Sequence, residues 1–266
     1  LAMIPHLEHG IGTFLPQKGM GDITDSLVKL AERLGVQFHY NAPVSRIQHQ
    51  DGRVGGIELQ DGTVWQSSTV VSNMDVVPTY RKLMPDWPAP EPVLNQERSS
   101  SALIFYWGMK SNFPALGLHN IFFSDDYPGE FRALFEDKMP GSDPTVYVNI
   151  TSKLAHQEEP EGCENWFVMI NTPADKGQDW DAITHSIRER FIKKINLILG
   201  VNLEDYIVEE DFLTPPLIQQ KTQSHQGALY GSSSNDRMAA FLRHPNFSQQ
   251  IKNLYFCGGS VHPGGG

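Results

Sequence analysis

Apolar residues recur at helical spacing in two separate parts of the chain. In the first part, the spacing predicts a helix over residues 22–34, with Asp22 or Thr24 as its cap and Gly35 ending it. The apolar positions of this helix are Ile23, Leu27, Leu30, Ala31 and Leu34. In the second part, the spacing predicts a long amphipathic helix that ends near Gly200. Its apolar positions are Trp180, Ile183, Ile187, Phe191, Ile195 and Ile198.

Between residues 36 and 73 the pattern changes to short apolar or alternating runs, which are typical of strands. Asp51-Gly52 and Asp61-Gly62 are tight hairpin signals. We therefore expect a small antiparallel meander followed by a return strand. The strands expected here are 36–40, 44–48, 54–59, 63–65 and 69–73.

Five prolines between residues 78 and 92 mark a plausible domain boundary, with a short helix over 76–84. Beyond them we expect a second helix over 127–138 and several strands with few crossovers, which favours a mixed or antiparallel sheet. Thr214-Pro-Pro216 is expected to stop the last strand. The expected strands are 101–109, 119–124, 145–151, 166–171 and 206–212.

These elements predict an α+β or α/β fold with two parts. The first is a partial cofactor-binding domain made of residues 1–74 and completed by a carboxyl-terminal strand and glycine-rich turn, 249–266. The second is a substrate-binding domain over 75–248, built on the mixed or antiparallel sheet and its helices.

Composition narrows the possible functions. A chain of 266 residues with 39% hydrophobic residues can build a real core, and a net charge of −10 opposes binding to nucleic acid. Cys163 and Cys257 show no metal-ligand spacing. No signal peptide is visible, and no apolar run approaches the roughly 20 residues of a membrane helix. We therefore expect a cytoplasmic protein whose membrane contact, if any, is peripheral.

Three weaker motifs carry little chemistry. Gly10-Ile-Gly12 is read as a turn, because Leu15 stands where the third glycine of a dinucleotide fingerprint belongs and no strand precedes it. His6 and His9 have no third ligand nearby, so we expect a surface pair and no metal site. Ser260 is not part of a Gly-x-Ser-x-Gly elbow, which argues against a hydrolase.

Two glycine-containing stretches are more informative. Gln226-Gly-Ala-Leu-Tyr-Gly231 predicts backbone lying close to something flat, with a surface turn as the alternative. Leu254-Tyr-Phe256 reads as a buried strand, and the glycine-rich segment 258–266 follows it at once. Such glycines let backbone N–H groups approach an anionic ligand. A flexible tail is the rival interpretation.

Three stretches together resemble the bacterial phytoene-desaturase type of carotenoid oxidoreductase, a group of flavoproteins in the glutathione-reductase-like superfamily. The stretches are Pro16-Gln-Lys-Gly-Met20 with the following helix and Val44-x-x-Ile47; Asp61-Gly62 leading to Val70-Val71-Ser-Asn73; and Asn253 to Gly266.

This resemblance implies roles for matching residues. Val44 would contact the adenine half of FAD through its backbone, Gly258 and Gly259 would pass near the pyrophosphate and ribityl chain, and the segment from His262 through Pro263 to Gly264 would lie along the isoalloxazine. Gly259 or Ser260 stands where many relatives carry an acidic residue for the ribityl hydroxyls.

Further roles follow from the same resemblance. Lys18, Gly19 and Met20 would approach the flavin ring from the other side, and Tyr230 with Gly231 would border the substrate tunnel. No catalytic residue is assigned.

The resemblance also implies segments that the sequence does not contain. Members of the group begin with a strand, a Gly-x-Gly-x-x-Gly loop and a helix that hold the FAD pyrophosphate, and they carry a helix after the carboxyl-terminal glycines. We therefore expect the chain to be an internal or carboxyl-proximal fragment, or an incompletely represented protein. We also expect this chain alone to be inactive and to hold no FAD tightly.

For the parent protein, the resemblance implies removal of a hydride and a proton from a C–C bond of a long polyene, with a carotenoid or other long isoprenoid as substrate and a membrane surface as partner. Aromatic residues could line a tunnel or belong to an ordinary core. They are Phe105, Tyr106, Trp107, Phe122, Phe123, Trp166 and Phe167. Basic residues of the long helix could meet lipid headgroups or simply face solvent. They are Arg188, Arg190, Lys193 and Lys194.

Two alternatives stay open at this point. One is a carotenoid isomerase or saturase of the same group. The other is a non-catalytic module that binds an apolar lipid through residues 75–248 alone. The sequence makes no prediction of oligomeric state.

Overall fold

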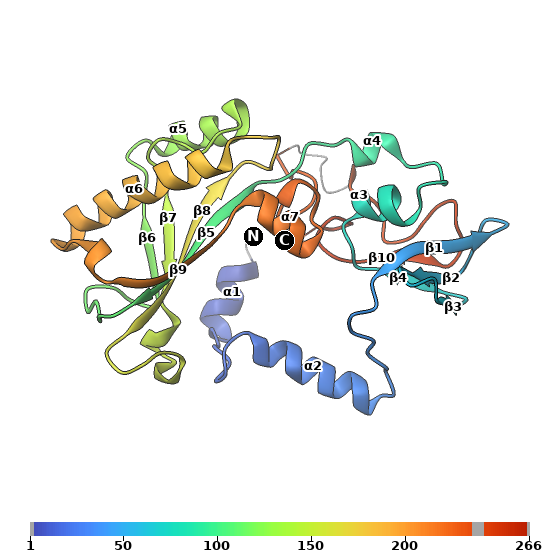
Figure 1. The fold of residues 1–266 in the computed structure, drawn as a ribbon, viewed down its shortest axis with the longest axis horizontal. Coiled ribbons are helices and arrows are strands. Elements are labelled where there is room, and N and C mark those ends of the chain that lie inside the picture. The colour runs from blue at the N-terminus through green and yellow to red at the C-terminus, as the bar shows by residue number, and fades with distance from the viewer. Residues whose placement is uncertain (1–2, 236–241, 265–266) are drawn as a thin grey trace.

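The computed structural model describes residues 3–235 and 242–264, which form two lobes with a pair of amino-terminal helices beside them (Figure 1). The larger lobe is built on a five-stranded sheet. The smaller lobe holds a three-stranded antiparallel sheet and a two-stranded parallel sheet. The prediction of a mixed α+β architecture with antiparallel sheets is confirmed.

The five-stranded sheet has the order β6-β7-β8-β5-β9, and every neighbouring pair is antiparallel. Alternation along its central strands sends one set of side chains into the core and the other set to the opposite face. The strands are β5 (Ser101–Met109), β6 (His119–Phe122), β7 (Val146–Asn149), β8 (Glu164–Thr172) and β9 (Ile207–Leu213).

Helix α6 (Trp180–Leu199) covers the core face of this sheet (Figure 1). Asp179 caps its first turn by accepting a hydrogen bond from the Ala182 backbone N–H at 3.0 Å, and Gly200 ends it in a left-handed conformation. The apolar positions predicted from the sequence form the buried face, except Ile198, which is 55% exposed. Phe191, for example, stacks on Trp107 of β5 with ring centroids 5.9 Å apart.

The smaller lobe has a separate core. Buried residues of the antiparallel sheet pack there with residues that follow β4 and with residues near the carboxyl terminus, so the cluster crosses the predicted boundary at residue 75. The strands are β1 (Val44–Gln50), β2 (Arg53–Leu59), β3 (Val64–Gln66), β4 (Val70–Ser72) and β10 (Leu254–Phe256). The core residues are Ile47, Val54, Val76, Val77, Tyr80, Met84, Leu94, Ile251, Leu254, Phe256 and Val261.

Shorter helical elements connect the sheets. The α-helical ones are α3 (Val76–Pro78), α4 (Glu91–Leu94), α5 (Tyr127–Arg132) and α7 (Pro215–Thr222). Two π-helical turns continue α3 and α5, namely η1 (Thr79–Leu83) and η2 (Ala133–Asp137). The 3₁₀ turns are η3 (Thr151–Lys153), η4 (His156–Glu158), η5 (Leu203–Asp205) and η6 (His225–Gly227).

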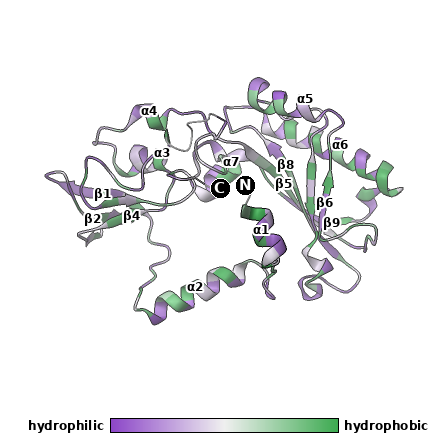
Figure 2. Ribbon diagram, turned by 180° about the vertical axis from the view of Figure 1, so that it is seen from behind, coloured by the Kyte–Doolittle hydropathy of each residue, from purple (hydrophilic) through white to green (hydrophobic). Residues whose placement is uncertain are grey.

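The amino-terminal helices α1 (Met3–Gly10) and α2 (Gly21–Arg33) bury none of their residues. Both lie beside the two lobes, and α2 carries an apolar stripe of the kind that helices use for packing (Figures 1 and 2). Its apolar side chains are exposed, with Leu27 at 60% and Leu34 at 76%.

Several local expectations are wrong. Residues 36–40 are not a strand, because no strand among the described residues pairs with them. Helix α2 begins after Met20, with no side-chain cap from Asp22 or Thr24. Helix α1 was not predicted and contains Gly10, and α7 begins at Pro215, where the two prolines start a helix after ending a strand.

A buried ion pair joins the two lobes. Asp75, the residue that caps α3, pairs with Arg98 just before β5, and their side chains are 7% and 4% exposed. The same carboxylate accepts hydrogen bonds from the Val77 backbone at 3.0 Å and from the His225 backbone at 3.3 Å. Burial lowers the pKa of Arg98, and the nearby Asp75 carboxylate opposes that shift. The junction therefore depends on matched buried charges.

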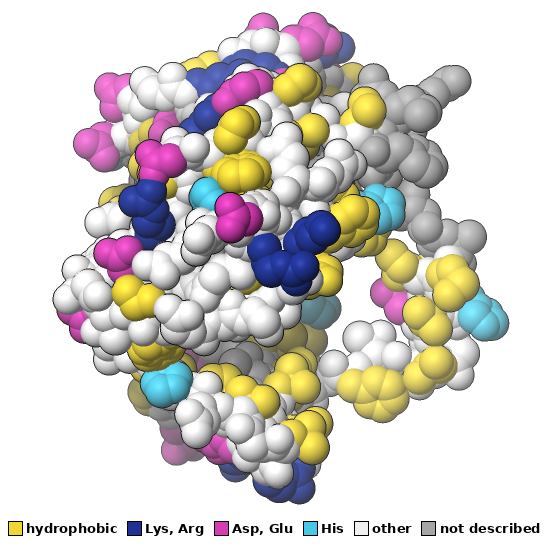
Figure 3. Space-filling model, turned by 90° about the vertical axis from the view of Figure 1, so that its right-hand side faces the viewer, with side chains coloured by type: hydrophobic (Ala, Val, Ile, Leu, Met, Phe, Trp, Pro, Cys, Tyr) yellow, Lys and Arg dark blue, Asp and Glu magenta, His cyan; other side chains and the backbone are white. Residues whose placement is uncertain are grey.

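None of the described helices is both long and apolar enough to span a bilayer. At the end of the molecule seen in Figure 3, described Lys and Arg side chains are scattered among acidic and apolar ones.

Candidate functional site

The carboxyl-terminal glycine turn is fixed at its start by the parallel pair of strands. Residues of β10 lie opposite β4, with Leu254 opposite Val70 and Phe256 opposite Ser72. The Cys257 backbone N–H then donates to the Ser72 carbonyl at 3.0 Å. The buried Leu254 and Phe256 hold the strand in the core, as the sequence predicts.

Gly258 occupies a position that strongly favours glycine. Its φ of +105° lies in the region that favours glycine, and a Cβ there would lie 2.9 Å from Oδ1 of Asn73. The side chain of Asn73, which follows β4, therefore crosses directly over the glycine. This close approach explains why the strand is followed at once by Gly258.

The second glycine stretch packs against the first. Gly231 has a φ of +71°, and a Cβ there would lie 2.5 Å from Cα of Ser260 and 2.9 Å from the Gly259 carbonyl oxygen. In the fold, the backbone of Gly259 and Ser260 packs against Gly231, and contact of this stretch with a flat ligand stays a prediction. Tyr230 is 49% exposed next to this contact, and its backbone N–H donates to Oγ of Ser99 at 3.0 Å.

Arg243 holds the two glycine stretches together and was missed by the sequence analysis. Its Nη1 donates to the carbonyls of Tyr230 and Gly259 at 2.7 and 2.9 Å. Its Nη2 donates to Ser232 O at 2.8 Å and to Ser234 Oγ at 2.9 Å. Gly264 lies against the guanidinium, since a Cβ there would be 2.7 Å from Cζ. The residue is 5% exposed, and burial lowers the pKa of Arg243.

His244 supports the turn from the core side. Its carbonyl accepts from the His262 backbone N–H at 2.8 Å, and its ring lies 3.0 Å from the hydroxyl of Tyr80. Because Nδ1 faces the Pro245 carbonyl at 2.7 Å, that nitrogen carries the proton and Nε2 accepts from Tyr80. Burial lowers the pKa of His244, so the neutral ring is favoured.

Ser260 faces the fold. It is 8% exposed, and its Oγ accepts a hydrogen bond from the Val76 backbone N–H at 3.1 Å, which ties the turn to the start of α3. In this arrangement the hydroxyl contributes to the architecture of the turn. A direct contact between Ser260 and a cofactor stays a prediction.

The outer edge of the turn is open to solvent. Gly258, His262 and Pro263 are exposed, whereas Gly259 and Gly264 are partly buried. The backbone that the sequence analysis assigned to a cofactor therefore lies on one accessible edge, backed by Asn73, Gly231 and Arg243. Gly265 and Gly266 lie outside the described residues.

A large groove of about 1100 Å³ runs along the open side of β4. It is lined by Val44, at the start of β1, and by Asn73, which also covers Gly258. The groove therefore contains one predicted cofactor contact, Val44, and extends to the residue that covers another, Gly258. Its apolar lining residues are Val44, Ile47, Ile57, Trp65, Val70, Val71, Met74 and Leu83.

The turn formed by Lys18, Gly19 and Met20 lies beside the larger lobe. The neighbouring Gln17 carbonyl accepts from Nε2 of Gln157 at 3.0 Å. A Cβ on Gly19 would lie 3.2 Å from a carboxylate oxygen of Glu158. These contacts hold the turn against the larger lobe, and its approach to a flavin ring stays a prediction.

The aromatic residues divide between the two faces of the five-stranded sheet. Phe105, Trp107 and Trp166 are at most 1% exposed in the core that α6 covers, so the core interpretation is right for them. Tyr106 and Phe167 lie on the opposite face, with ring centroids 5.7 Å apart.

The basic residues of α6 are partly occupied by the fold. Arg188 pairs with Glu210 at 2.7 Å, and Lys194 pairs with Asp143 at 2.9 Å. Nη1 of Arg190 donates to the Ser142 carbonyl at 3.0 Å. These contacts favour a surface held by ion pairs over a headgroup-binding face. Among the described residues, no group of three His, Cys, Asp or Glu side chains is placed to hold a metal ion.

Comparison with known proteins identifies the family. Residues 2–265 match the family described as flavin containing amine oxidoreductase. The chain belongs to this family. The resemblance inferred from the glycine turn and the flanking motifs is therefore confirmed at family level.

The similar curated proteins act on carotenoids by name. The chain is 53% identical over 266 residues to 1-hydroxycarotenoid 3,4-desaturase of Flavobacterium sp. strain P99-3, a match that covers 100% of the chain and 54% of that protein. It is 35% identical over 272 residues to 4,4'-diapolycopene oxygenase of Methylomonas sp., covering 99% of the chain and 54% of that protein. The chain thus spans about half the length of these relatives.

Solved structures agree on the fold. An oxidoreductase from Methanosarcina mazei has a TM-score of 0.61 at 14% identity, covering 93% of this chain and 51% of that one. A putrescine oxidase variant has a TM-score of 0.54 at 17% identity, covering 90% and 46%.

The residues present fit a flavin dinucleotide. The family implies this cofactor, and the glycine turn offers exposed backbone where a side chain at Gly258 would clash. The adjacent groove is large, and its lining combines apolar side chains with polar ones such as Ser72 and Asn73. Close backbone approach and a large, mainly apolar groove are features that suit an extended dinucleotide.

Proposed function

We propose that the protein containing this chain is an FAD-dependent carotenoid desaturase. The observation that carries the proposal is 53% identity, along the whole chain, to a protein named 1-hydroxycarotenoid 3,4-desaturase. The accessible glycine turn, held from behind by Arg243 and Asn73, supports it as a cofactor-binding wall. Bound flavin would supply the hydride acceptor, and the substrate would lose one hydride and one proton as a C–C single bond becomes double.

Specific residues would hold the cofactor. We propose that Val44 contacts the adenine end and that Gly258 and Gly259 admit the pyrophosphate and ribityl chain. His262, Pro263 and Gly264 would face the ring, with Lys18, Gly19 and Met20 on its other side. Tyr230 and Gly231 would border the substrate path. The contribution of the protein is to hold these surfaces in place and to keep water from the reacting bond.

Product analysis tests the reaction. The full-length protein is supplied with a 1-hydroxycarotenoid, and the product is analysed by mass spectrometry and absorption. Loss of two hydrogens with a red-shifted spectrum supports the desaturase. Unchanged mass would identify an isomerase, gain of two hydrogens a saturase, and no product despite binding an apolar-lipid-binding module; each of these results contradicts the proposal.

An oxygenase is the second candidate, because the chain is also 35% identical to 4,4'-diapolycopene oxygenase. The same experiment separates the two functions, since an oxygenase product gains oxygen. The greater identity to the desaturase favours dehydrogenation.

We further propose that this 266-residue chain holds no FAD tightly by itself, because only part of the predicted contacts lies on it. Flavin absorbance of the purified chain tests this point, and a stoichiometric spectrum would contradict it. Peripheral membrane contact is proposed from the apolar substrate alone. Flotation of the full-length protein with phospholipid vesicles tests it, and failure to float would contradict it.

A further inference from the structure

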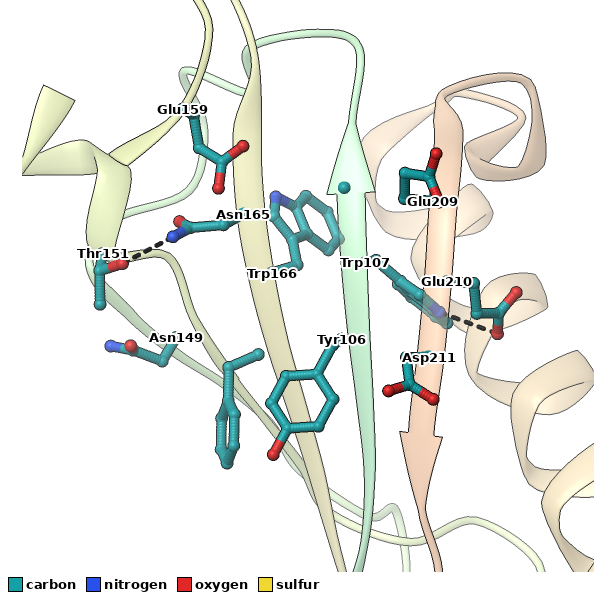
Figure 4. Close-up of a pocket in the computed structure, with 12 residues that line it drawn as sticks. Tyr106, Trp107, Asn149, Thr151, Glu159, Asn165, Trp166, Glu209, Glu210 and Asp211 are labelled. Carbon is teal, nitrogen blue, oxygen red and sulfur yellow. Dashed lines mark hydrogen bonds between the residues drawn. The ribbon is translucent and has the colours of Figure 1, made fainter. Parts of the chain in front are cut away.

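A second cavity lies on the open face of the five-stranded sheet, and its lining residues are different from those of the glycine turn. It encloses about 480 Å³. Strand register places two rows of side chains on this face (Figure 4). In one row Phe167 and Asp211 lie opposite Tyr106, and in the other Asn165 and Glu209 lie opposite Gly108.

The cavity exists because position 108 carries no side chain. A Cβ on Gly108 would already lie 3.2 Å from Cβ of Glu209. The glycine leaves space between the polar rim formed by Asn165 and the acidic rim formed by Glu209, and the ring of Tyr106 lies beside that space (Figure 4). We call this space the Gly108 hollow.

Polar groups gather at one end of the Gly108 hollow, and most of them are already paired. Nδ2 of Asn165 donates to Thr151 Oγ1 at 2.8 Å, its Oδ1 accepts from the Ser152 backbone at 3.0 Å, and Thr151 also bonds Glu158. Glu159 differs, since its side chain makes no hydrogen bond or ion pair with any described residue. Burial, with a contribution from Glu158, raises the pKa of Glu159.

The segment expected to face the flavin ring contacts the turn that precedes Glu159. Glu159 directly follows the turn η4, and Gln157 of that turn is hydrogen-bonded to Gln17. Gly19 packs against Glu158 of the same turn. The unpaired carboxyl is therefore close in the chain to residues that contact the Lys18–Met20 segment.

The chemistry of the proposed substrate requires such proximity. In a 1-hydroxycarotenoid that is desaturated between carbons 3 and 4, only one carbon separates the hydroxyl-bearing carbon from the reacting bond. The group that binds the hydroxyl must therefore lie next to the surface that meets that bond. An aromatic wall ending in an unpaired hydrogen-bonding group matches a polyene that ends in a hydroxyl.

We propose that the Gly108 hollow binds the hydroxylated end of the carotenoid, with Tyr106 and Phe167 against the hydrocarbon and the carboxyl of Glu159 hydrogen-bonded to the hydroxyl. The inference rests on the proposed desaturase function and names the residue that selects its substrate. A site that binds a substrate hydroxyl discriminates against the analogue that lacks it.

The test compares two substrates with the full-length protein: a 1-hydroxycarotenoid and the same carotenoid without the hydroxyl. Glu159→Ala is expected to lower the ratio of their kcat/KM values by about tenfold, the loss of one charge-assisted hydrogen bond, while the value for the unhydroxylated substrate stays unchanged. Glu159→Gln, which keeps a hydrogen-bonding group, should retain most of the ratio. Glu209→Ala on the opposite rim is the matched control and should leave it intact.

A binding measurement keeps this inference separate from the proposed reaction. Trp107 and Trp166 lie on the strands that form the hollow, so quenching of tryptophan fluorescence by each carotenoid in detergent reports its affinity without turnover. The wild type should bind the hydroxylated compound about tenfold more tightly, and Glu159→Ala should abolish that preference. Equal affinities in the wild type, or an unchanged preference in Glu159→Ala, would overturn the inference even if desaturation is observed. A preference without turnover would overturn only the proposed reaction.

Discussion

Helices α6 and α2 are both amphipathic, yet they contribute to the structure in opposite ways. Helix α6 buries seven residues against the five-stranded sheet, whereas α2 buries none of its thirteen. The two sequences follow the same pattern, because both carry apolar residues at intervals of three and four. The difference in burial therefore does not come from the pattern itself. An apolar stripe thus indicates that a helix has a packing face. It does not indicate which part of the protein packs against that face.

The largest loss of stability is expected in the core of the larger lobe. Phe191→Ala removes a buried ring that stacks on Trp107, which should lower the free energy of unfolding by about 3–5 kcal/mol. Urea unfolding followed by circular dichroism measures this. Leu197→Ala on the same helix is the control, since Leu197 is 87% exposed and its loss should change stability by about 0.5 kcal/mol or less. Similar losses for both variants would contradict the assignment of the buried face.

The junction between the lobes should be nearly as sensitive. Asp75→Ala leaves the buried Arg98 without its partner and frees two backbone N–H groups, for an expected loss of about 3 kcal/mol. Asp86→Ala breaks the exposed pair with Arg46 and should cost less than about 1 kcal/mol. Denaturation midpoints of the two variants decide the matter, and equal midpoints would show that the buried pair adds nothing specific.

The contact between the glycine stretches should give an intermediate effect. Gly231→Ala combines an unfavourable φ with a clash against Ser260, for an expected loss of about 2–3 kcal/mol. Gly200→Ala is matched for backbone conformation, with a φ of +67°, but has open space around the new methyl group, so about 1 kcal/mol is expected. Thermal unfolding of both variants separates strain from steric clash, and equal shifts would argue against close packing at Gly231.

The smaller lobe should lose stability at acidic pH. Because burial lowers the pKa of His244 in the folded state, its contribution is complete above the unfolded value of about 6.5 and is lost as pH falls from there toward the folded pKa. The expected slope is at most about 1.4 kcal/mol per pH unit for this group. His225 has a pKa lowered mainly by burial and adds in the same direction.

Urea midpoints at pH 7.5, 6.5 and 5.5 measure this dependence. His244→Asn keeps a donor toward the Pro245 carbonyl. It should reduce the loss of stability between pH 6.5 and 5.5, which we call the acidic limb of the stability curve. His185→Asn changes a histidine whose side chain is 75% exposed, and it should leave the limb as it is. An unchanged limb in His244→Asn would exclude the buried ring as its source.

The smallest effect is expected on α2. Leu27→Ala in the 266-residue chain should change the free energy of unfolding by about 0.5 kcal/mol or less, since Leu27 is 60% exposed and Ala favours helix. The same substitution in the full-length protein tests whether the stripe is covered there. A loss of about 2 kcal/mol or more would show burial, and no change would show that the face stays open.

The sequence predicts most elements whose signal is local. β5 and α6 were found with nearly correct limits, because alternation and a glycine cap are properties of a few neighbouring residues. Residues 36–40 were wrongly assigned because a strand needs a neighbour, and α7 was missed because a proline pair can end one element and start the next.

The candidate site shows the same limit. The glycine-rich segments were predicted from their composition, yet Arg243, which binds them together, carries no recognisable motif. Its partners come from residues 230–234 and from Gly259, segments that meet only in the folded chain. The Gly108 hollow was missed for a related reason, since register across three strands creates it.

The alternation along β5 has a consequence for how this protein can change over evolutionary time. Trp107 packs under α6, while its neighbours Tyr106 and Gly108 face the hollow. Successive residues of one strand are therefore constrained by different things, namely core packing and the shape of the hollow. Substitutions on the hollow side can alter which molecule is accepted while the packing that keeps the sheet folded is retained. The strand thus offers a route by which new substrate preferences can arise at little risk to folding.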